Sequence, residues 1–441
     1  MYYKPCTCQV DISILLLPYM RLQILVVLYC AKVLGFLSRL FGTGRGTSIP
    51  GWVVEKYTPS VMKYFAGSYK HIIFISGTNG KTTTRSLVVH ALRAKGFTVV
   101  TNSGGANIYR GIAASLLQDL TWLGTIKSLV AVLEVEEATL PKLSQYLPAD
   151  VLLLTNLARD QLDVYGELAI TQEYFMQTIR QMPRAGVILN IDDPKLLELP
   201  VFADIGVSLK SSNIEYETSQ TVHAKIQGLL VAQENKTQLI LTYQDTAITF
   251  VPQLTGQYNS INYALAASVL ICAGLTLQDI KPAFETSVPV FGRSENIRSS
   301  SASHTLLLVK NPLGFGSVLT SYKNKHIHNL MVGINDNIAD GRDVSWLWDV
   351  DFEHFLQSQT QLNEVIVTGT RQEDIYVRLS QAIRSVNLKI SIIAMSLDEV
   401  AELLLETKQD YTIFGTYTVT LGIRNRLEQP LGLLPIDSDQ F

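Results

Sequence analysis

The 441-residue sequence has few cysteines and no dense run of lysine and arginine. Its four cysteines, Cys6, Cys8, Cys30 and Cys272, are too few and too badly placed for a disulfide framework, which favours a reducing cytosol. The Cys6–Cys8 pair has no second pair at zinc-finger spacing, so we expect no metal there. Because the formal net charge is only −3 and no basic tract is present, the composition argues against nucleic acid as a partner.

The sequence also lacks a hydrophobic run long enough to cross a membrane. In the apolar N-terminal segment, residues 1–44, Arg21 and Lys32 divide the pattern, and the clean stretch LQILVVLYCA is shorter than the ~20 residues that a spanning helix needs. No Ala-x-Ala cleavage site marks a signal peptide. We expect a helix in the membrane interface; the alternative is a helix packed on the protein or on a partner. Met20 is an alternative start of the chain.

From Lys70 onward, strand-like segments alternate with helix-like ones. The segments HIIFIS, FTVVTN, SLVAVLEV, DVLLLTN and AGVILN are apolar and rich in β-branched residues, and helical patterns such as Lys81–Lys95 separate them. Continuous apolar strands with helices between them predict a mostly parallel sheet covered on both faces. Residues 205–255 predict antiparallel hairpins attached to this sheet. Residues 256–274 predict a long helix that ends at a glycine.

A second alternating block predicts a second, Rossmann-like α/β domain. Its strand candidates are HTLLLVKN, HNLMVGIN, NEVIVTG, KISIIAM and DYTIFGTY. A serine-rich joint precedes the block, so we place the domain boundary near Ser299–Ser303. The predicted organisation is an apolar segment over 1–44, a central phosphate-binding domain over 45–298 and a C-terminal α/β domain over 299–441.

A glycine-rich loop joins the first strand of the central domain to its first helix. Backbone N–H groups of such a loop, opening onto a helix N-terminus, cradle phosphate oxygens. We expect Lys81 to neutralise the β- and γ-phosphates of ATP and the Thr82 hydroxyl to bind Mg²⁺. Ile75 stands where the usual pattern has a glycine, so this is a shorter form of the loop. It reads Gly77-Thr78-Asn79-Gly80-Lys81-Thr82-Thr83.

Carboxylates follow two strands of the same predicted sheet. Glu134 ends the strand SLVAVLEV, at the edge where ligands bind in open α/β folds, and is placed to hold Mg²⁺ directly or through water. The alternative is a strand-end acid that faces solvent. Asp160, Gln161 and Asp163 follow the next strand toward the same rim, although any of them could instead cap a helix.

Six motifs occur in a fixed order: GTNGKTTT, LEVEEA, TNLARDQLDVYG, LNIDDP, GQYNSINYALAA and FGRSE. Over roughly residues 45–296 this set resembles the ATPase core of the Mur ligase superfamily, which activates a carboxylate as an acyl phosphate with ATP and lets an amine attack it. By matching positions, the resemblance implies that Asn259 and Asn262 contact the nucleotide and that Arg293 contacts its phosphates. Residues three apart share a helix face, which supports the asparagine pair. The alternative for the pair is an exposed polar helix edge.

The sequence departs from the superfamily pattern at several positions, and these differences limit the class of substrate that we expect. The loop begins at residue 77, without room ahead of it for the domain that grips a uridine nucleotide in precursor-ligating relatives. Gln161 replaces a usual histidine. The segment ITQEYFMQTIRQM has no lysine where many relatives carry a carbamylated lysine near a second Mg²⁺. We therefore expect a substrate other than a uridine nucleotide.

The second block is similar to the MurT family, the ligase subunits of lipid II isoglutaminyl synthase, in KNPLGF, GINDNIADGRDVSWLWDVDFE and TGTRQEDIYVRL. The resemblance implies amidation of the α-carboxyl of D-glutamate in the peptidoglycan stem of lipid II, with ATP and Mg²⁺. It also implies a heterodimer with a glutaminase of the GatD type, which supplies ammonia, and a cytoplasmic location at the inner face of the plasma membrane. Residues 195–255 contain no cysteine, so we expect none of the zinc ribbons that such chains often carry.

Five acids crowd the segment ADGRDVSWLWDVDFE. The resemblance implies that one aspartate orients the glutaminase histidine and completes a Cys-His-Asp triad across the interface. We predict that this residue is Asp349, with Asp343 and Asp351 as rivals. The alternative is that the acids cap helices or face solvent while the two tryptophans pack. Lys310 is expected either to reach ATP or the substrate carboxylate, or to be structural.

The sequence shows no nucleophile of its own for freeing ammonia from glutamine, because Cys272 lies on the apolar face of its helix and is interpreted as a core residue. Glutamine hydrolysis therefore belongs to a partner, or free ammonia serves. Two other functions stay open. One is an amino-acid ligase of the folylpolyglutamate or cyanophycin type. The other is a nucleotide-binding regulatory subunit without ligase chemistry, an idea that Gln161 and the missing lysine favour.

Overall fold

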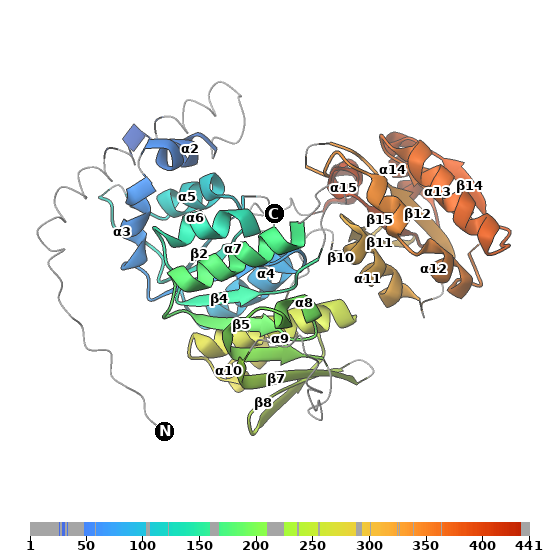
Figure 1. Cartoon of the computed structure of the whole chain (residues 1–441). Helices are drawn as coiled ribbons and strands as arrows, with labels where there is room; N and C mark the ends of the chain where they lie inside the picture. The colour runs from blue at the N-terminus through green and yellow to red at the C-terminus, as the bar shows by residue number, and fades with distance from the viewer. Residues whose placement is uncertain are drawn as a thin grey trace, which may run out of the picture.

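The computed structural model describes most of the chain from Ser48 onward. The described residues are 48–57, 59–102, 106–121, 123–158, 167–209, 225–235, 238–254, 256–287, 293–299, 301–323, 325, 327–337, 339–362 and 364–433, with 26, 29, 30 and 33 in isolation. They form two α/β units, each built on its own sheet (Figure 1). The expected interfacial helix over 1–44 lies almost wholly outside the described residues and stays a prediction. No helix in the described part of the chain has the length and apolar character to cross a membrane.

The first unit is built on a nine-stranded sheet with the order β2-β3-β1-β4-β5-β6-β7-β8-β9. Neighbours from β2 to β7 pair in parallel, and β7, β8 and β9 pair antiparallel, which confirms the predicted sheet and its attached hairpins. Strand β6, in the segment FADIGVS, was not foreseen from the sequence. The strands are β1 (His71–Ser76), β2 (Val99–Thr101), β3 (Val130–Glu134), β4 (Val151–Leu154), β5 (Gly186–Asn190), β6 (Phe202–Ser208), β7 (Lys225–Asn235), β8 (Gln238–Tyr243) and β9 (Thr246–Phe250).

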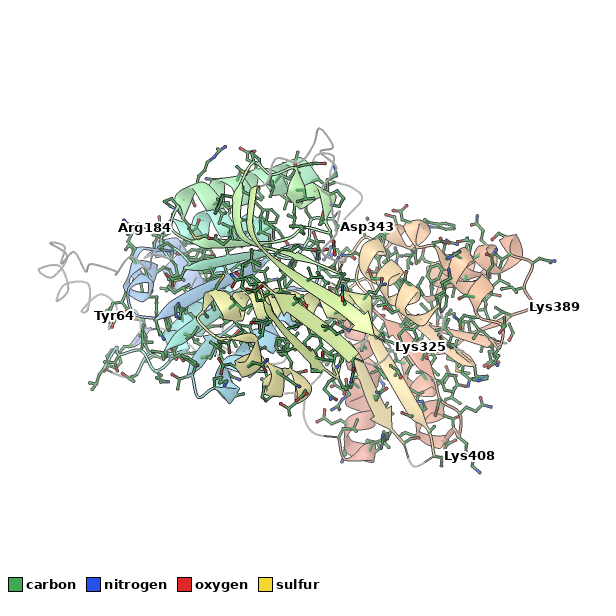
Figure 2. All side chains as sticks on the ribbon, turned by 90° about the horizontal axis from the view of Figure 1, so that it is seen from below. Tyr64, Arg184, Lys325, Asp343, Lys389 and Lys408 are labelled. Atoms are coloured by element: carbon green, nitrogen blue, oxygen red, sulfur yellow. The ribbon has the colours of Figure 1, made fainter. Side chains whose placement is uncertain are left out.

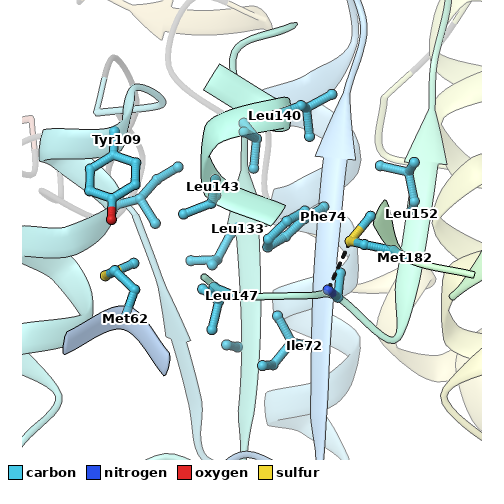
Figure 3. Packing of buried hydrophobic residues seen from close by; sticks show 14 of the residues in the cluster. Met62, Ile72, Phe74, Tyr109, Leu133, Leu140, Leu143, Leu147, Leu152 and Met182 are labelled. Atoms are coloured by element: carbon cyan, nitrogen blue, oxygen red, sulfur yellow. Dashed lines mark hydrogen bonds between the residues drawn. The ribbon is translucent and has the colours of Figure 1, made fainter. Parts of the chain in front are cut away.

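Helices cover both faces of this sheet and form two separate cores. Along β1, Ile72 and Phe74 enter one core while Ile73 and Ile75 enter the other, because successive strand side chains point to opposite faces. Figure 3 shows the first core, where Leu143 and Leu147 lie over the strands. Its helices are α2 (Ser48–Tyr57), α3 (Met62–Ala66), α5 (Tyr109–Gln118), α6 (Leu140–Ser144), α7 (Glu167–Gln181) and α8 (Pro194–Leu197). The second core is covered by α4 (Lys81–Ala94), α9 (Gln257–Cys272) and α10 (Leu277–Glu285).

The second unit is built on a six-stranded sheet with the order β10-β11-β15-β12-β13-β14. All neighbours pair in parallel except β10, which runs antiparallel to β11. The boundary predicted near Ser299–Ser303 falls at the turn between β10 and β11, so the second sheet already includes Arg293. The strands are β10 (Arg293–Arg298), β11 (Ser303–Leu308), β12 (Asn329–Gly333), β13 (Glu364–Thr368), β14 (Ser391–Ala394) and β15 (Thr412–Gly415). The helices are α11 (Pro312–Tyr322), α12 (Phe352–Ser358), α13 (Gln372–Ser385), α14 (Leu397–Glu406) and α15 (Tyr417–Leu431).

Candidate active site

The glycine-rich loop lies between β1 and α4, at the carboxyl edge of the first sheet. Gly77 and Gly80 have φ values of +121° and +88°, a region that residues with a Cβ rarely adopt. A Cβ on Gly80 would lie 2.5 Å from Asn262 Oδ1, and a Cβ on Gly77 would collide with Thr155 Oγ1. Both glycines are therefore required by conformation and by space. The loop opens onto the N-terminus of α4, where free N–H groups favour an anion.

The segment that follows β4 holds the loop in this shape. Asn156 accepts from the Thr78 N–H through its carbonyl at 3.0 Å and from the Asn79 N–H through Oδ1 at 2.9 Å. The Asn79 carbonyl in turn accepts from Thr155 Oγ1 at 2.7 Å and from Asn156 Nδ2 at 2.9 Å. This part of the motif TNLARD thus braces the phosphate loop. Its continuation, with Asp160, Gln161 and Asp163, lies outside the described residues.

Lys81 lies among three carboxylates at the end of β3 and directly after it. Its Nζ donates to the Gly77 carbonyl at 2.5 Å and to Glu137 Oε1 at 2.9 Å. Burial by itself lowers the pKa of Lys81, but the nearby charges of Glu137, Glu136 and Glu134 outweigh burial and raise it above its ordinary value. Lys81 is therefore a permanent cation at the loop. The sequence analysis did not single out Glu136 and Glu137, although both belong to the motif LEVEEA directly after Glu134.

Glu134 is only 4% exposed at the end of β3. The Oε2 atom of Glu134 lies 3.7 Å from Arg85 Nε. Within the described ranges this oxygen accepts no hydrogen bond. The hydroxyls of Ser76 and Thr83, on either side of the loop, are also buried without a hydrogen-bond partner among the described residues. Buried oxygens that lack protein partners are the kind of ligand that a hard cation or its waters would satisfy. Together with the glycine cradle, they fit a magnesium-bound nucleotide.

The predicted asparagine pair of α9 lies directly against the loop. Asn262 is 1% exposed, and its Oδ1 accepts from Thr84 Oγ1 at 3.3 Å, while its Nδ2 donates to Asn259 Oδ1 at 3.4 Å. Both asparagines are buried, so the alternative of an exposed helix edge is wrong. Their contact with a nucleotide stays a prediction. So does the role of Arg293, which begins β10 but whose side chain lies outside the described part.

The C-terminal unit reaches this loop through a pair of side-chain amides. Asn79 Nδ2 donates to Asn311 Oδ1 at 3.4 Å, and Asn311 Nδ2 donates to Asn79 Oδ1 at 3.3 Å. Asn311 is fully buried and caps α11 by accepting from the Gly314 N–H at 2.8 Å. Burial raises the pKa of Glu136, and the positive charge of the neighbouring Lys310 opposes this rise. The site is thus shared between the two units. Asn311 belongs to the segment KNPLGF, but the sequence analysis did not single it out.

In the acidic segment 340–353, four of the five carboxylates already have partners. Asp340 accepts from Thr418 N–H at 2.7 Å, Asp343 from Ser345 N–H at 2.8 Å, Asp351 from His354 N–H at 2.9 Å, and Glu353 pairs with Arg378 at 2.7 Å. Asp349 differs, because its side chain is exposed and no hydrogen bond to it is recorded among the described residues. Figure 2 shows Asp343, in the same segment, on the side of the C-terminal unit that faces the first unit. Among these five acids, Asp349 is thus the one whose carboxylate is exposed and makes no hydrogen bond within the described ranges.

Replacing Gly80 with alanine is expected to abolish nucleotide binding. The left-handed backbone costs a residue with a Cβ about 1–2 kcal/mol, and the added carbon also displaces Asn262. Gly96→Ala is the matched control, because Gly96 has a φ of +83° but nothing within 4 Å of the added carbon. Calorimetric titration with ATP measures the nucleotide affinity of each variant, and a thermal unfolding curve measures its stability. The two measurements separate loss of binding from loss of the fold. Equal ATP affinity in Gly80→Ala and Gly96→Ala would contradict the assigned cradle.

The fold is shared with several solved ligases. MurF of Acinetobacter baumannii superposes with a TM-score of 0.61 at 16% identity, over 85% of this chain and 79% of that chain. MurF of Thermotoga maritima, solved in complex with ADP, gives 0.59 at 17% identity over 84% and 83%. Folylpolyglutamate synthase of Mycobacterium tuberculosis, also complexed with ADP, gives 0.58 at 15% identity over 83% and 92%. The architecture is that of the Mur-type ligases.

The sequence matches two families, one for each unit. Residues 75–270 match the Mur ligase middle domain, and residues 308–420 match the family described as MurT ligase C-terminal. The MurT subunit of the lipid II isoglutaminyl synthase (glutamine-hydrolyzing) of Staphylococcus aureus strain N315 is 30% identical over 388 residues, 80% of this chain and 87% of that subunit. The corresponding subunit of Streptococcus pneumoniae strain ATCC BAA-255 / R6 is 32% identical, over 78% and 83%. The chain belongs to the MurT family.

Proposed function

We propose that this chain is the ATP-dependent ligase subunit of a lipid II isoglutaminyl synthase. The reaction is amidation of the D-glutamate α-carboxyl of the peptidoglycan stem in lipid II, giving D-isoglutamine. The observation that carries the proposal is similarity to MurT subunits across both α/β units, and not only across the ATPase core that all Mur-type ligases share.

The geometry supports phosphoryl transfer as the first half of this reaction. The glycine cradle and the N-terminus of α4 would bind the phosphates of ATP, with Asn259, Asn262 and Arg293 as further nucleotide contacts. Lys81 would stabilise the negative charge that develops as the γ-phosphoryl group moves to the D-glutamyl carboxylate. Glu134 and Thr82 would hold Mg²⁺, which screens the phosphate charges when it is bound. Ammonia would then attack the acyl phosphate and release inorganic phosphate.

The second half of the reaction needs a source of ammonia. Burial raises the pKa of the Cys272 thiol to about 12, so this cysteine is not a thiolate near neutral pH. We assign glutamine hydrolysis to a glutaminase partner of the GatD type and place its docking surface on the C-terminal unit. The similar MurT chains are subunits of glutamine-hydrolyzing synthases, which supports this assignment. Asp349, the acid of segment 340–353 that is exposed and has no hydrogen bond within the described part of the chain, would orient the partner's histidine. Contact of the chain with the membrane that carries lipid II belongs to the same proposal.

The test is an amidation assay on the purified chain with ATP, Mg²⁺ and lipid II. Phosphate release and product mass are followed with ammonium or with glutamine, in the presence and absence of the co-expressed glutaminase. We expect the product to be lighter by the difference between a hydroxyl and an amino group, and glutamine to work only with the glutaminase. Incorporation of an amino acid instead would indicate a ligase of the folylpolyglutamate type. ATP binding without any product would indicate a regulatory subunit.

A further inference from the structure

Arg378 is a buried arginine on α13 that reaches out of its own helix. Only 5% of the residue is exposed. Its Nε donates to the Leu347 carbonyl at 3.2 Å, and one terminal nitrogen donates to the Val350 carbonyl at 2.6 Å. Both terminal nitrogens also pair with the Glu353 carboxylate, at 2.7 and 2.8 Å. The side chain therefore ties α13 to the short helical turn Ser345–Asp349 and to the first turn of α12.

The aromatic side chains of the same segment enclose the guanidinium. The Arg378 Cζ lies 5.8 Å from the centre of the Trp348 ring and 5.3 Å from that of Phe352. Phe352 is buried in the core, whereas Trp348 is 52% exposed and covers the arginine from the solvent side. Removing a guanidinium from water costs free energy. The hydrogen bonds, the ion pair with Glu353 and the two ring contacts together have to compensate for that cost. They therefore favour a single arrangement of the segment.

The two carbonyls that Arg378 binds belong to Leu347 and Val350, the residues on either side of the pair Trp348–Asp349. The backbone that carries Asp349 is thus fixed at both ends by one side chain from another helix. The Asp349 carboxylate itself projects to solvent from this fixed stretch. A catalytic group that acts across an interface has to be held within a fraction of an ångström, and misplacement by 1 Å can cost roughly 10²-fold in rate.

We infer that Arg378 is a positioning residue for Asp349, holding the 347–350 backbone so that this carboxylate meets the histidine of the glutaminase partner. The inference rests on the proposed function. It requires an arginine in particular, because a guanidinium can bind two carbonyls and a carboxylate at once. A lysine ammonium has neither the planar fork nor the reach for all three.

The test compares variants of the chain in complex with the glutaminase. The variants are Arg378→Met and Arg378→Lys, with Asp349→Asn as reference and Arg384→Met as matched control, because Arg384 is an exposed arginine on the same helix. The readout is the glutamine-supported amidation rate divided by the ammonium-supported rate, at saturating glutaminase. We expect this ratio to fall roughly 10- to 100-fold in both Arg378 variants through the kcat for glutamine hydrolysis, with little change in the KM for glutamine. Arg384→Met should leave the ratio unchanged.

Each outcome decides the inference. A ratio that stays normal in the Arg378 variants, while Asp349→Asn lowers it, overturns the positioning role and leaves the proposed function intact. A ratio that is lowered only when glutaminase is below saturation also overturns it, because Arg378 would then serve docking alone. An unchanged ratio in Asp349→Asn removes the assigned role of Asp349, and the inference with it. If Arg378→Met does not assemble, Arg378→Lys, which keeps the charge and most of the length, still gives the ratio.

Discussion

Replacing Lys81 with methionine is expected to lower the rate of ATP-dependent amidation by roughly 10²- to 10³-fold, whichever nitrogen source is used. Methionine keeps much of the length of the side chain but removes the only cation that the described residues place in the glycine loop, where Nζ lies between the Gly77 carbonyl and Glu137. The loss should appear mainly in kcat, because charge develops on the transferred phosphoryl group. It is measured as phosphate release under saturating ATP.

The matched control for this variant is Lys95→Met, just beyond the other end of α4. Lys95 forms a half-exposed ion pair with Asp279 at 2.8 Å, far from the loop. An exposed pair contributes little to stability, so Lys95→Met should keep normal turnover. Comparable turnover in Lys81→Met and Lys95→Met would show that Lys81 does not contribute to phosphoryl transfer, and the assignment of this loop as the site of transfer would have to be abandoned.

Replacing Asp349 with asparagine is expected to lower glutamine-supported amidation on the order of 10³-fold or more, while ammonium-supported amidation continues. An amide cannot stabilise the charged imidazole of the partner and can favour its wrong tautomer. The fold should be unaffected, because the side chain is exposed and no hydrogen bond to it is recorded in the described ranges. Parallel rate measurements with glutamine and with ammonium on one preparation of the complex give the comparison.

Asp351→Asn is the control for this second prediction. Asp351 caps α12 by accepting from the His354 N–H, and asparagine caps a helix about as well as aspartate. The substitution therefore removes a negative charge two residues away without loosening the helix. A selective loss with glutamine in Asp351→Asn, and not in Asp349→Asn, would transfer the triad role to Asp351.

The two variants probe two half-reactions on different units of the chain. Lys81 lies on the first unit, where phosphate is transferred, and Asp349 lies on the second, where the glutaminase is proposed to dock. The Asn79–Asn311 pair connects the two units at the phosphate loop. We expect Lys81→Met to lower the amidation rate with both nitrogen sources and Asp349→Asn to lower it with glutamine alone. This pattern would separate activation of the carboxylate from supply of ammonia.

Much of the fold was predictable because its signals are local. Continuous apolar segments between helical patterns identified β1 to β5 and all strands from β11 to β15. Most of these strands are buried on both faces and therefore need apolar residues at nearly every position, whereas the edge strand β14 is largely exposed. Strand β6 was missed because FADIGVS contains an acid and a glycine and pairs with strands on both sides only in the assembled sheet. The phosphate loop was predictable for a similar local reason. Gly77 and Gly80 are needed by the backbone itself.

The sequence by itself determined the succession of strands and helices along the chain, the phosphate loop and the family motifs. These features depend on residues that are near one another in the chain. Only the tertiary structure decided which side chains meet there. Lys81 with Glu137 and Asn79 with Asn311 are contacts between distant segments, the second across 232 positions. The same holds for the partners of the acids in segment 340–353. All five look alike in sequence, and Asp349 is distinguished because folding gives each of the other four a partner and leaves its carboxylate exposed.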